Sequence, residues 1–214
     1  HKLGYIDKNG KIVIEPQFEI RGPAFEEKES EFLNKKNFSE GYAAVEINNK
    51  YGYIDKNGKI VIEPQFDDAE NFSEGLALVG IKGEDKSDYK YGYIDKNGKI
   101  VIEAQFDNAE NFSEGLAVVG IKGSNGYDYK CGYIDKNGKI VIEPQFERAS
   151  LFSEGTASVS LNSRYGYIKN PLTVQNLVVY HDKPDLLVGE IKQISVNEII
   201  IGGNQIGEHV QIGD

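Results

Sequence analysis

The residues of this chain that could do chemistry begin with a recurring serine. Ser-Glu-Gly occurs four times, at residues 39–41, 73–75, 113–115 and 153–155. A serine nucleophile of the Gly-x-Ser-x-Gly type needs glycine on both sides and a histidine partner, and neither accompanies these serines. We therefore expect each Ser-Glu-Gly to be a tight turn that leads into a strand. We predict no catalytic residues and no enzymatic activity.

The metal-ligating residue types are also present, but their spacing is wrong for a metal site. Asp55-Lys56-Asn57-Gly58 is similar to the start of a calcium loop, yet the glycine comes too early and Glu63 cannot supply the bidentate twelfth ligand. The three histidines, His1, His181 and His209, share no ligand spacing. Cys131 is the only cysteine, which excludes an intramolecular disulfide, and we expect it to be a small buried hydrophobe. We predict no metal site and no cofactor.

Three tyrosines are the best candidates for binding. Tyr89 lies in Asp88-Tyr89-Lys90, and Tyr129 lies in the equivalent Asp128-Tyr129-Lys130, with Tyr127 beside it. Both segments belong to insertions, where function tends to concentrate, and tyrosine is enriched in the energetic centres of protein interfaces. The alternative is that these rings pack onto the start of the next strand.

Composition and charge limit the partners. The 214 residues carry 24 Lys and Arg against 34 Asp and Glu, a formal net charge of −10. Nucleic acid is therefore an unfavourable partner, because its recognition needs a basic patch that neutralises phosphates. No run of about 18 apolar residues is present, so we expect no membrane-inserted helix. The chain opens with His1 in the middle of a repeat, and we interpret it as a fragment of a bacterial protein whose compartment, including secretion or the cell surface, is left open.

An internal repeat organises the chain. Gly-Tyr-Ile-Asp-Lys-Asn-Gly-Lys begins at four glycines, and each copy continues with Ile-Val-Ile-Glu-(Pro/Ala)-Gln-Phe and then Phe-Ser-Glu-Gly. A degenerate fifth start follows at Gly166. The first copy carries an insertion after Phe18, and copies two and three carry insertions of 6 residues after their Phe-Ser-Glu-Gly. We divide the chain into a repeat domain, residues 1–168, and a small β-rich segment, residues 169–214. The four repeats are residues 4–51, 52–91, 92–131 and 132–165.

Turn chemistry predicts what each repeat forms. Asn-Gly favours a two-residue type I′ hairpin turn, because both of its central positions need positive φ. With Asn57 and Gly58 as that turn, Ile54 pairs with Val61, and Tyr53 pairs with Ile62. Tyr53 and Ile62 then lie on the core face, while Ile54 and Val61 lie on the other face. We expect Pro64 to end the second strand, and residues 75–81 to form the third strand of the repeat.

The fold class that follows is all-β, with three-stranded antiparallel units stacked into an open, twisted meander. A lone unit cannot bury its apolar face, so stacking stabilises such arrays. A propeller is the alternative, but its blades usually have four strands. Pro23 could begin a helix that runs to Leu33. We expect the tail to cap the last repeat or to begin a small SH3-like barrel.

The three motifs in this order resemble the bacterial WG repeat, also called the KWG repeat, over residues 3 to about 168. The Trp-Gly pair of that family is replaced in this chain, which has no Trp, by Leu3-Gly4, Tyr51-Gly52, Tyr91-Gly92, Cys131-Gly132 and Tyr165-Gly166. The replacements keep a large apolar side chain in most copies, which indicates a packing role. The resemblance implies a repeat scaffold and no particular activity.

Two functions follow as hypotheses. The first is a non-catalytic scaffold that offers an extended surface to another protein. The alternative is a carbohydrate or cell-wall binding module, which the 13 tyrosines and 10 phenylalanines suggest. Exposed rings that repeat at the pitch of the array would favour a glycan. Tyrosines buried beneath a charged exterior would favour a protein.

Overall fold

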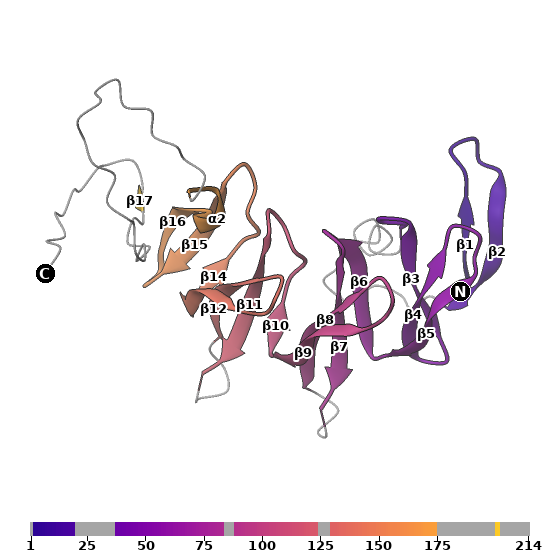
Figure 1. Cartoon of the computed structure of the whole chain (residues 1–214), viewed down its shortest axis with the longest axis horizontal. Coiled ribbons are helices and arrows are strands. Elements are labelled where there is room, and N and C mark those ends of the chain that lie inside the picture. The colour runs from indigo at the N-terminus through magenta and orange to yellow at the C-terminus, as the bar shows by residue number, and fades with distance from the viewer. Residues whose placement is uncertain (1, 20–36, 84–87, 124–128, 175–199, 202–214) are drawn as a thin grey trace, which may run out of the picture.

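The structure is a computed structural model that describes residues 2–19, 37–83, 88–123, 129–174 and 200–201. These residues form antiparallel sheets that follow one another along the long axis of the molecule (Figure 1). The first sheet contains β1 (Lys2–Ile6), β2 (Ile12–Glu19), β3 (Tyr42–Ile47), β4 (Lys50–Asp55) and β5 (Ile60–Phe66). The second contains β6 (Asp68–Ser73), β7 (Leu76–Lys82), β8 (Tyr89–Asp95) and β9 (Ile100–Phe106).

The third and fourth sheets repeat this plan. The third contains β10 (Asn108–Ala109), β11 (Leu116–Lys122), β12 (Tyr129–Asp135) and β13 (Ile140–Phe146). The fourth contains β14 (Arg148–Ala149), β15 (Thr156–Leu161), β16 (Arg164–Lys169) and β17 (Ile200–Ile201), and the short helix α2 (Pro171–Val174) follows β16. The two ends of the array lie far apart (Figure 1). The expected all-β fold with an open array is therefore confirmed, rather than the propeller-like alternative.

The sheets are offset from the sequence repeats. Each inner sheet combines the Phe-Ser-Glu-Gly half of one repeat with the Gly-Tyr-Ile hairpin of the next. An additional strand, β6, begins at Asp68, and the two-residue strands β10 and β14 occupy the same place in later sheets. An inner sheet therefore has four strands rather than three. The repeat and domain boundaries drawn from the sequence stay predictions.

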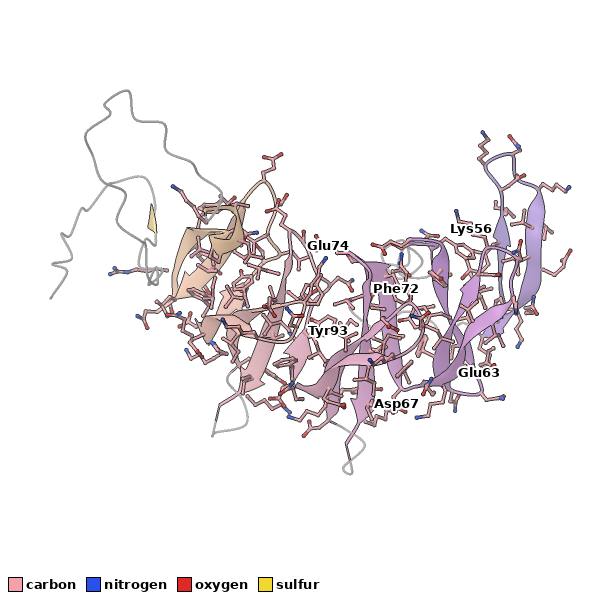
Figure 2. All side chains as sticks on the ribbon, viewed as in Figure 1. Lys56, Glu63, Asp67, Phe72, Glu74 and Tyr93 are labelled. Atoms are coloured by element: carbon pink, nitrogen blue, oxygen red, sulfur yellow. The ribbon has the colours of Figure 1, made fainter. Side chains whose placement is uncertain are left out.

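Apolar cores fill the space between successive sheets. The core between the second and third sheets contains Tyr93 and Ile102 from one side and Phe112, Val119 and Ile134 from the other. Equivalent residues form the cores before and after it. Figure 2 shows Phe72 and Tyr93 in the interior and Lys56 and Glu63 toward the outside. Stacking therefore buries the apolar faces that no single sheet can cover.

The hairpin strand β4 contributes to two cores at once. Tyr53 points to the second sheet, and Ile54 points the opposite way, toward Ile14, Ala43 and Val45. Both side chains are fully buried. Our placement of Ile54 outside the core face was therefore wrong, because the expected register considered one hairpin alone, whereas neighbouring hairpins cover both faces of this strand.

The Asn-Gly hairpins form as expected, but the turn type was wrong. The Gly58 N–H donates to the Asp55 carbonyl, and the Asp55 N–H donates to the Lys59 carbonyl. Gly58 has a φ of 80°, whereas Asn57 is absent from the positive-φ residues. This is a type I turn followed by a bulge glycine. The carboxylate of Asp55 favours it, because its Oδ1 accepts the N–H groups of Asn57 and Lys59, both at 2.9 Å.

The register changes with the turn. Tyr53 pairs with Ile62 as expected, but Ile54 pairs with Ile60 rather than Val61. Between the pairs Tyr53–Ile62 and Tyr51–Phe66, Gly52 alone faces the three residues 63–65, so strand β5 bulges around Gly52. Pro64 lies inside this bulge, where it needs no hydrogen bond in the sheet. Strand β5 therefore continues through Pro64 to Phe66 instead of ending there.

Several sequence predictions fall outside the described residues. The helix expected to begin at Pro23 lies in the segment 20–36, which the structure does not describe. Of the tail, the structure describes α2 and strand β17, which pairs with β16 through Gly166 and Ile201. The alternatives for residues 169–214, a cap or a partial SH3-like barrel, stay predictions.

Candidate functional site

Two long hairpins distinguish the middle of the array from its ends. The hairpins β3–β4 and β15–β16 close with two-residue turns, Asn48-Asn49 and Asn162-Ser163, in which every φ lies between 51° and 65°. The hairpins β7–β8 and β11–β12 carry the 6-residue insertions and extend their pairing to Lys82–Tyr89 and Lys122–Tyr129. The insertions therefore place a tyrosine opposite a lysine at the end of each long hairpin.

Tyr89 packs against strand β7 at Gly80, where there is no side chain in its way. Its ring stacks on Tyr91, with centroids 6.0 Å apart and planes at 17°, and the Lys82 ammonium lies 5.4 Å from its centroid. A Cβ on Gly80 would come within 3.0 Å of the Tyr91 ring and 3.2 Å of the Tyr89 ring. Because residue 80 has no side chain, both rings can lie against β7. Tyr89 is half-buried, so part of its ring packs against the fold, as the alternative prediction has it, and part remains accessible.

Tyr129 occupies the equivalent position with less support. Lys122 Nζ lies 5.9 Å from its ring centroid, but Cys131 replaces the stacking partner that Tyr91 provides in the second sheet. Tyr129 is 38% exposed. Lys122 also binds Asp88 across the two hairpins at 2.8 Å. We call Lys82, Asp88, Tyr89, Lys122 and Tyr129 the long-hairpin patch; Tyr127 lies outside the described residues.

Ion pairs fix the base of the patch. Asp107 accepts a hydrogen bond from the Lys90 ammonium at 2.6 Å and another from the Lys122 N–H at 2.8 Å. Asp67 has the same contacts with Lys50 and Lys82 in the preceding sheet. Partial burial alone would raise the pKa of Asp107, but these donors and charges outweigh it and lower the pKa. The base of the long-hairpin patch therefore carries positive and negative charges whose positions are fixed by these hydrogen bonds and ion pairs.

The recurring serines form hydrogen bonds between neighbouring sheets. The hydroxyls of Ser39, Ser73 and Ser113 donate to the carbonyls of Phe72, Phe112 and Phe152 in the next sheet at 2.7–2.8 Å. The Ser-Glu-Gly segments are tight turns that enter strands, as expected: Ser113 and Leu116 exchange backbone hydrogen bonds across Glu114-Gly115, and the turns that begin at Ser39 and Ser153 make the same pair of bonds. Their role in the fold is therefore to join sheets.

The glutamates of the same turns were not singled out from the sequence. Glu40, Glu74 and Glu114 accept hydrogen bonds from the N–H groups of Gly75, Gly115 and Gly155, with closest distances of 3.0–3.1 Å. We call these serines and glutamates, with the groups they bind in the next sheet, the Ser-Glu ladder. Its only signal in the sequence is a charged residue at a turn position that favours Asn or Gly.

Lysines complete the ladder. Lys96 binds the Glu40 carboxylate at 3.0 Å, and Lys136 binds that of Glu74 at the same distance. Lys136 also donates to the Glu74 carbonyl. In the degenerate repeat, Asn170 replaces this lysine, is fully buried, and donates from Nδ2 to the Glu114 carbonyl at 2.9 Å.

The other residues whose types could support chemistry include the cysteine, the aspartate of the hairpin turn and the histidines. Cys131 is buried, and desolvation raises the pKa of its thiol, which disfavours the reactive thiolate. The Asp55 carboxylate accepts hydrogen bonds from the backbone N–H groups of its own turn. Among the described residues, no three metal-ligating side chains form a cluster. His181 and His209 lie outside them, as does His1. Within the part of the chain that the structure describes, no helix has the length and apolarity needed to cross a membrane.

Comparison with known proteins identifies the repeat. The family model described as the WG containing repeat matches residues 4–20, 36–51, 51–84, 91–123 and 132–165, more than half of the chain. No curated protein matches the chain.

Proposed function

The chain belongs to the WG-containing repeat family, and from this membership we propose that it is a non-catalytic scaffold whose repeats bind another protein. The long-hairpin patch is the proposed contact surface. It combines tyrosines with lysines at the ends of two neighbouring hairpins. Tyrosine is enriched at the centres of protein interfaces, and the surrounding rim is polar.

The distribution of the tyrosines carries this proposal. Tyr53, Tyr93 and Tyr133, the rings that recur in every inner hairpin, are at most 1% exposed. Their hydroxyls donate to backbone carbonyls at 2.7–2.8 Å, so these rings serve the core. Among the residues that the structure describes, the two most exposed tyrosine rings, Tyr165 and Tyr167, lie two residues apart in one strand rather than one per sheet. A glycan platform that repeats along the array is therefore disfavoured, and a protein partner is favoured.

The test uses the whole chain as bait and a matched pair of variants. Proteins captured from the source cell are identified by mass spectrometry and purified, and their affinity is measured by calorimetry. We expect Tyr89→Ala with Tyr129→Ala to weaken binding at least about tenfold, while Tyr165→Ala with Tyr167→Ala leaves it unchanged. A glycan array is run in parallel. Saturable glycan binding without a protein partner, or turnover of a substrate, would contradict the proposal.

A further inference from the structure

A second surface recurs in every hairpin, and the cores of the described array cover only part of it. The dipeptide Ile-Val begins each of the strands β2, β5, β9 and β13. Six of the thirteen exposed large hydrophobic side chains among the described residues belong to this dipeptide. They are Ile12, Val13, Val61, Ile100, Val101 and Ile140, which are 39–52% exposed.

The alternation of the strand explains why these side chains face solvent. The isoleucines that follow them, such as Ile62 and Ile102, are 4% exposed and fill the cores. Val61 lies one residue before Ile62 and therefore points to the other face. The register shifts between the pairs Tyr53–Ile62 and Ile54–Ile60, so Ile60 faces the same way as Ile54 and shares the face of Val61. Among the described strands, β5, β9 and β13 each lie at the edge of their sheet. Ile60 and Val141 pack partly against a core, whereas the other six side chains of the recurring pair are exposed.

Successive dipeptides are neighbours along the array. A Cβ on Gly98, in the turn of the β8–β9 hairpin, would lie 3.1 Å from Ile62 of the preceding hairpin. Gly58 and Gly138 make the same contact with Ile14 and Ile102. Each hairpin therefore rests on the one before it, which brings the Ile-Val pairs of adjacent sheets side by side. We call Val13, Val61, Val101 and Val141, each with its preceding isoleucine, the aliphatic row.

Charged side chains border the row on both sides. Two residues before each valine is an exposed lysine, and two residues after it is an exposed glutamate; these are Lys11, Lys59, Lys99 and Lys139, and Glu15, Glu63, Glu103 and Glu143. Residues two apart on a strand point the same way. The row therefore has a basic border on the side of the hairpin turns and an acidic border on the other. Figure 2 shows Lys56 and Glu63 at these two ends of the β4–β5 hairpin.

We propose that the aliphatic row is the docking site for an amphipathic α-helix of a partner protein, lying along the array. Stacked sheets are about 10 Å apart, and seven residues of an α-helix rise about 10.5 Å. A helix with an apolar residue at every seventh position therefore meets one Ile-Val pair per hairpin. An extended strand covers about 10 Å in three residues and alternates its faces, so it cannot present the same face to successive sheets.

The charged borders specify the flanks of that helix. An acidic flank faces the lysines, and a basic flank faces the glutamates. Turning such a helix end for end exchanges its flanks, so the charges also fix the direction in which it lies. This inference rests on the proposed function in one respect, that the partner is a protein, but it uses a different surface from the long-hairpin patch.

The test uses a synthetic peptide of four heptads, with leucine at every seventh position, glutamate along one flank and lysine along the other. Fluorescence anisotropy of the labelled peptide measures its binding to the whole chain. We expect saturable binding that Val61→Asp with Val101→Asp weakens at least about tenfold, a difference of about 1.4 kcal/mol. Ile81→Asp with Ile121→Asp is the matched control, because these isoleucines are each 41% exposed but lie at the other end of the sheets.

Two altered peptides test the geometry. Moving the leucines to every eighth position, or placing glutamate on both flanks, is expected to weaken binding at least about tenfold. Absence of saturable binding, indifference to the leucine spacing, or equal loss in the control pair would overturn the inference. Circular dichroism verifies that the variants fold, and Val61→Thr with Val101→Thr replaces the aspartates if they do not. Tyr89→Ala with Tyr129→Ala should not affect the peptide, so failure of the patch and failure of the row are distinguishable.

Discussion

At the scale of single residues, the glycine of the family motif is explained by a close approach of two backbones. A Cβ on Gly92 would lie 2.5 Å from the Ile102 carbonyl oxygen and 2.7 Å from the Ala104 nitrogen. Gly4, Gly52 and Gly132 make the same contacts with their own bulges. The bulge of the edge strand therefore requires glycine in the hairpin strand, whereas the preceding residue varies among Leu, Tyr and Cys.

This contact predicts a large cost for one methyl group. Gly92→Ala should reduce the free energy of unfolding by about 3 kcal/mol, because backbone atoms must move to accept the side chain. Gly83→Ala is the control: its Cβ would meet only the Asp88 carbonyl at 3.3 Å, and we expect a change within about 1 kcal/mol. Urea unfolding followed by circular dichroism measures both. Equal effects would show that the close approach is not limiting.

The buried tyrosines predict alkaline behaviour. Desolvation raises the pKa of Tyr53, Tyr93 and Tyr133 above the ordinary value of 10.0. A raised folded-state pKa contributes stability that is fully present below pH 10 and is lost as the pH rises toward the folded value. Absorbance at alkaline pH should therefore show fewer tyrosines ionised near pH 10.5 in the native protein than in urea. Identical titration curves in the two states would contradict this.

At the scale of elements, the Ser-Glu-Gly turn combines local strain with a long-range contact. Glu40, Glu74, Glu114 and Glu154 all have φ between 51° and 53°, a left-handed conformation that costs a residue with a Cβ about 1 kcal/mol. Asn would tolerate it better. Glutamate is long enough to reach the glycine N–H of the next sheet, and this hydrogen bond offsets the strain.

The ladder has an internal control. Glu74→Asn relieves the left-handed strain but removes the contacts with Gly115 and Lys136, so we expect a net loss of about 1 kcal/mol. Glu154 has the same φ at the last turn, and among the described residues it makes no contact with a following sheet. Glu154→Asn should therefore be neutral or stabilising by up to about 1 kcal/mol. Thermal unfolding measures both, and a loss at Glu154 as large as at Glu74 would refute the account.

The ladder also predicts acid sensitivity. Burial alone would raise the pKa of Glu40, but the Lys96 ammonium and the Gly75 N–H outweigh it, and its pKa lies below 4.5. A lowered folded-state pKa means that the contribution to stability is present above about pH 4.5 and is lost as the pH falls through the folded value. The stability difference between the native chain and Glu40→Gln should therefore shrink between pH 6 and pH 3. A constant difference would contradict this.

The elements show why the sequence predicted the fold better than its details. Repetition of one motif identified the hairpins and the stacking, because a unit that cannot bury its own apolar face needs neighbours. The type I′ turns occur at Glu-Gly and Asn48-Asn49 rather than at Asn57-Gly58, where the carboxylate of Asp55 decides the turn. The second core of Ile54 and the Ser-Glu ladder depend on contacts 33 to 41 residues apart, which no local pattern reveals.

At the scale of the whole molecule, the array is held by contacts between adjacent sheets. Each core joins two neighbouring sheets, and each step of the Ser-Glu ladder does the same. The long-hairpin patch and the aliphatic row therefore depend on the stacking of neighbours, since Lys122 and Asp88 come from different sheets. Stability in such arrays is approximately a sum of unit and nearest-neighbour terms.

A single core substitution should therefore act locally. Phe112 is 2% exposed and packs on Tyr93, with ring centroids 4.8 Å apart, so Phe112→Ala should cost about 3–5 kcal/mol. The loss falls on the contact between the second and third sheets. Hydrogen exchange measured by mass spectrometry should accelerate most in β7, β8, β11 and β12, and least in the β1–β2 hairpin of the first sheet, at the end of the array. Uniform acceleration from β1 to β16 would instead show that the array unfolds as one cooperative unit, and that a partner bound to either surface stabilises every sheet equally.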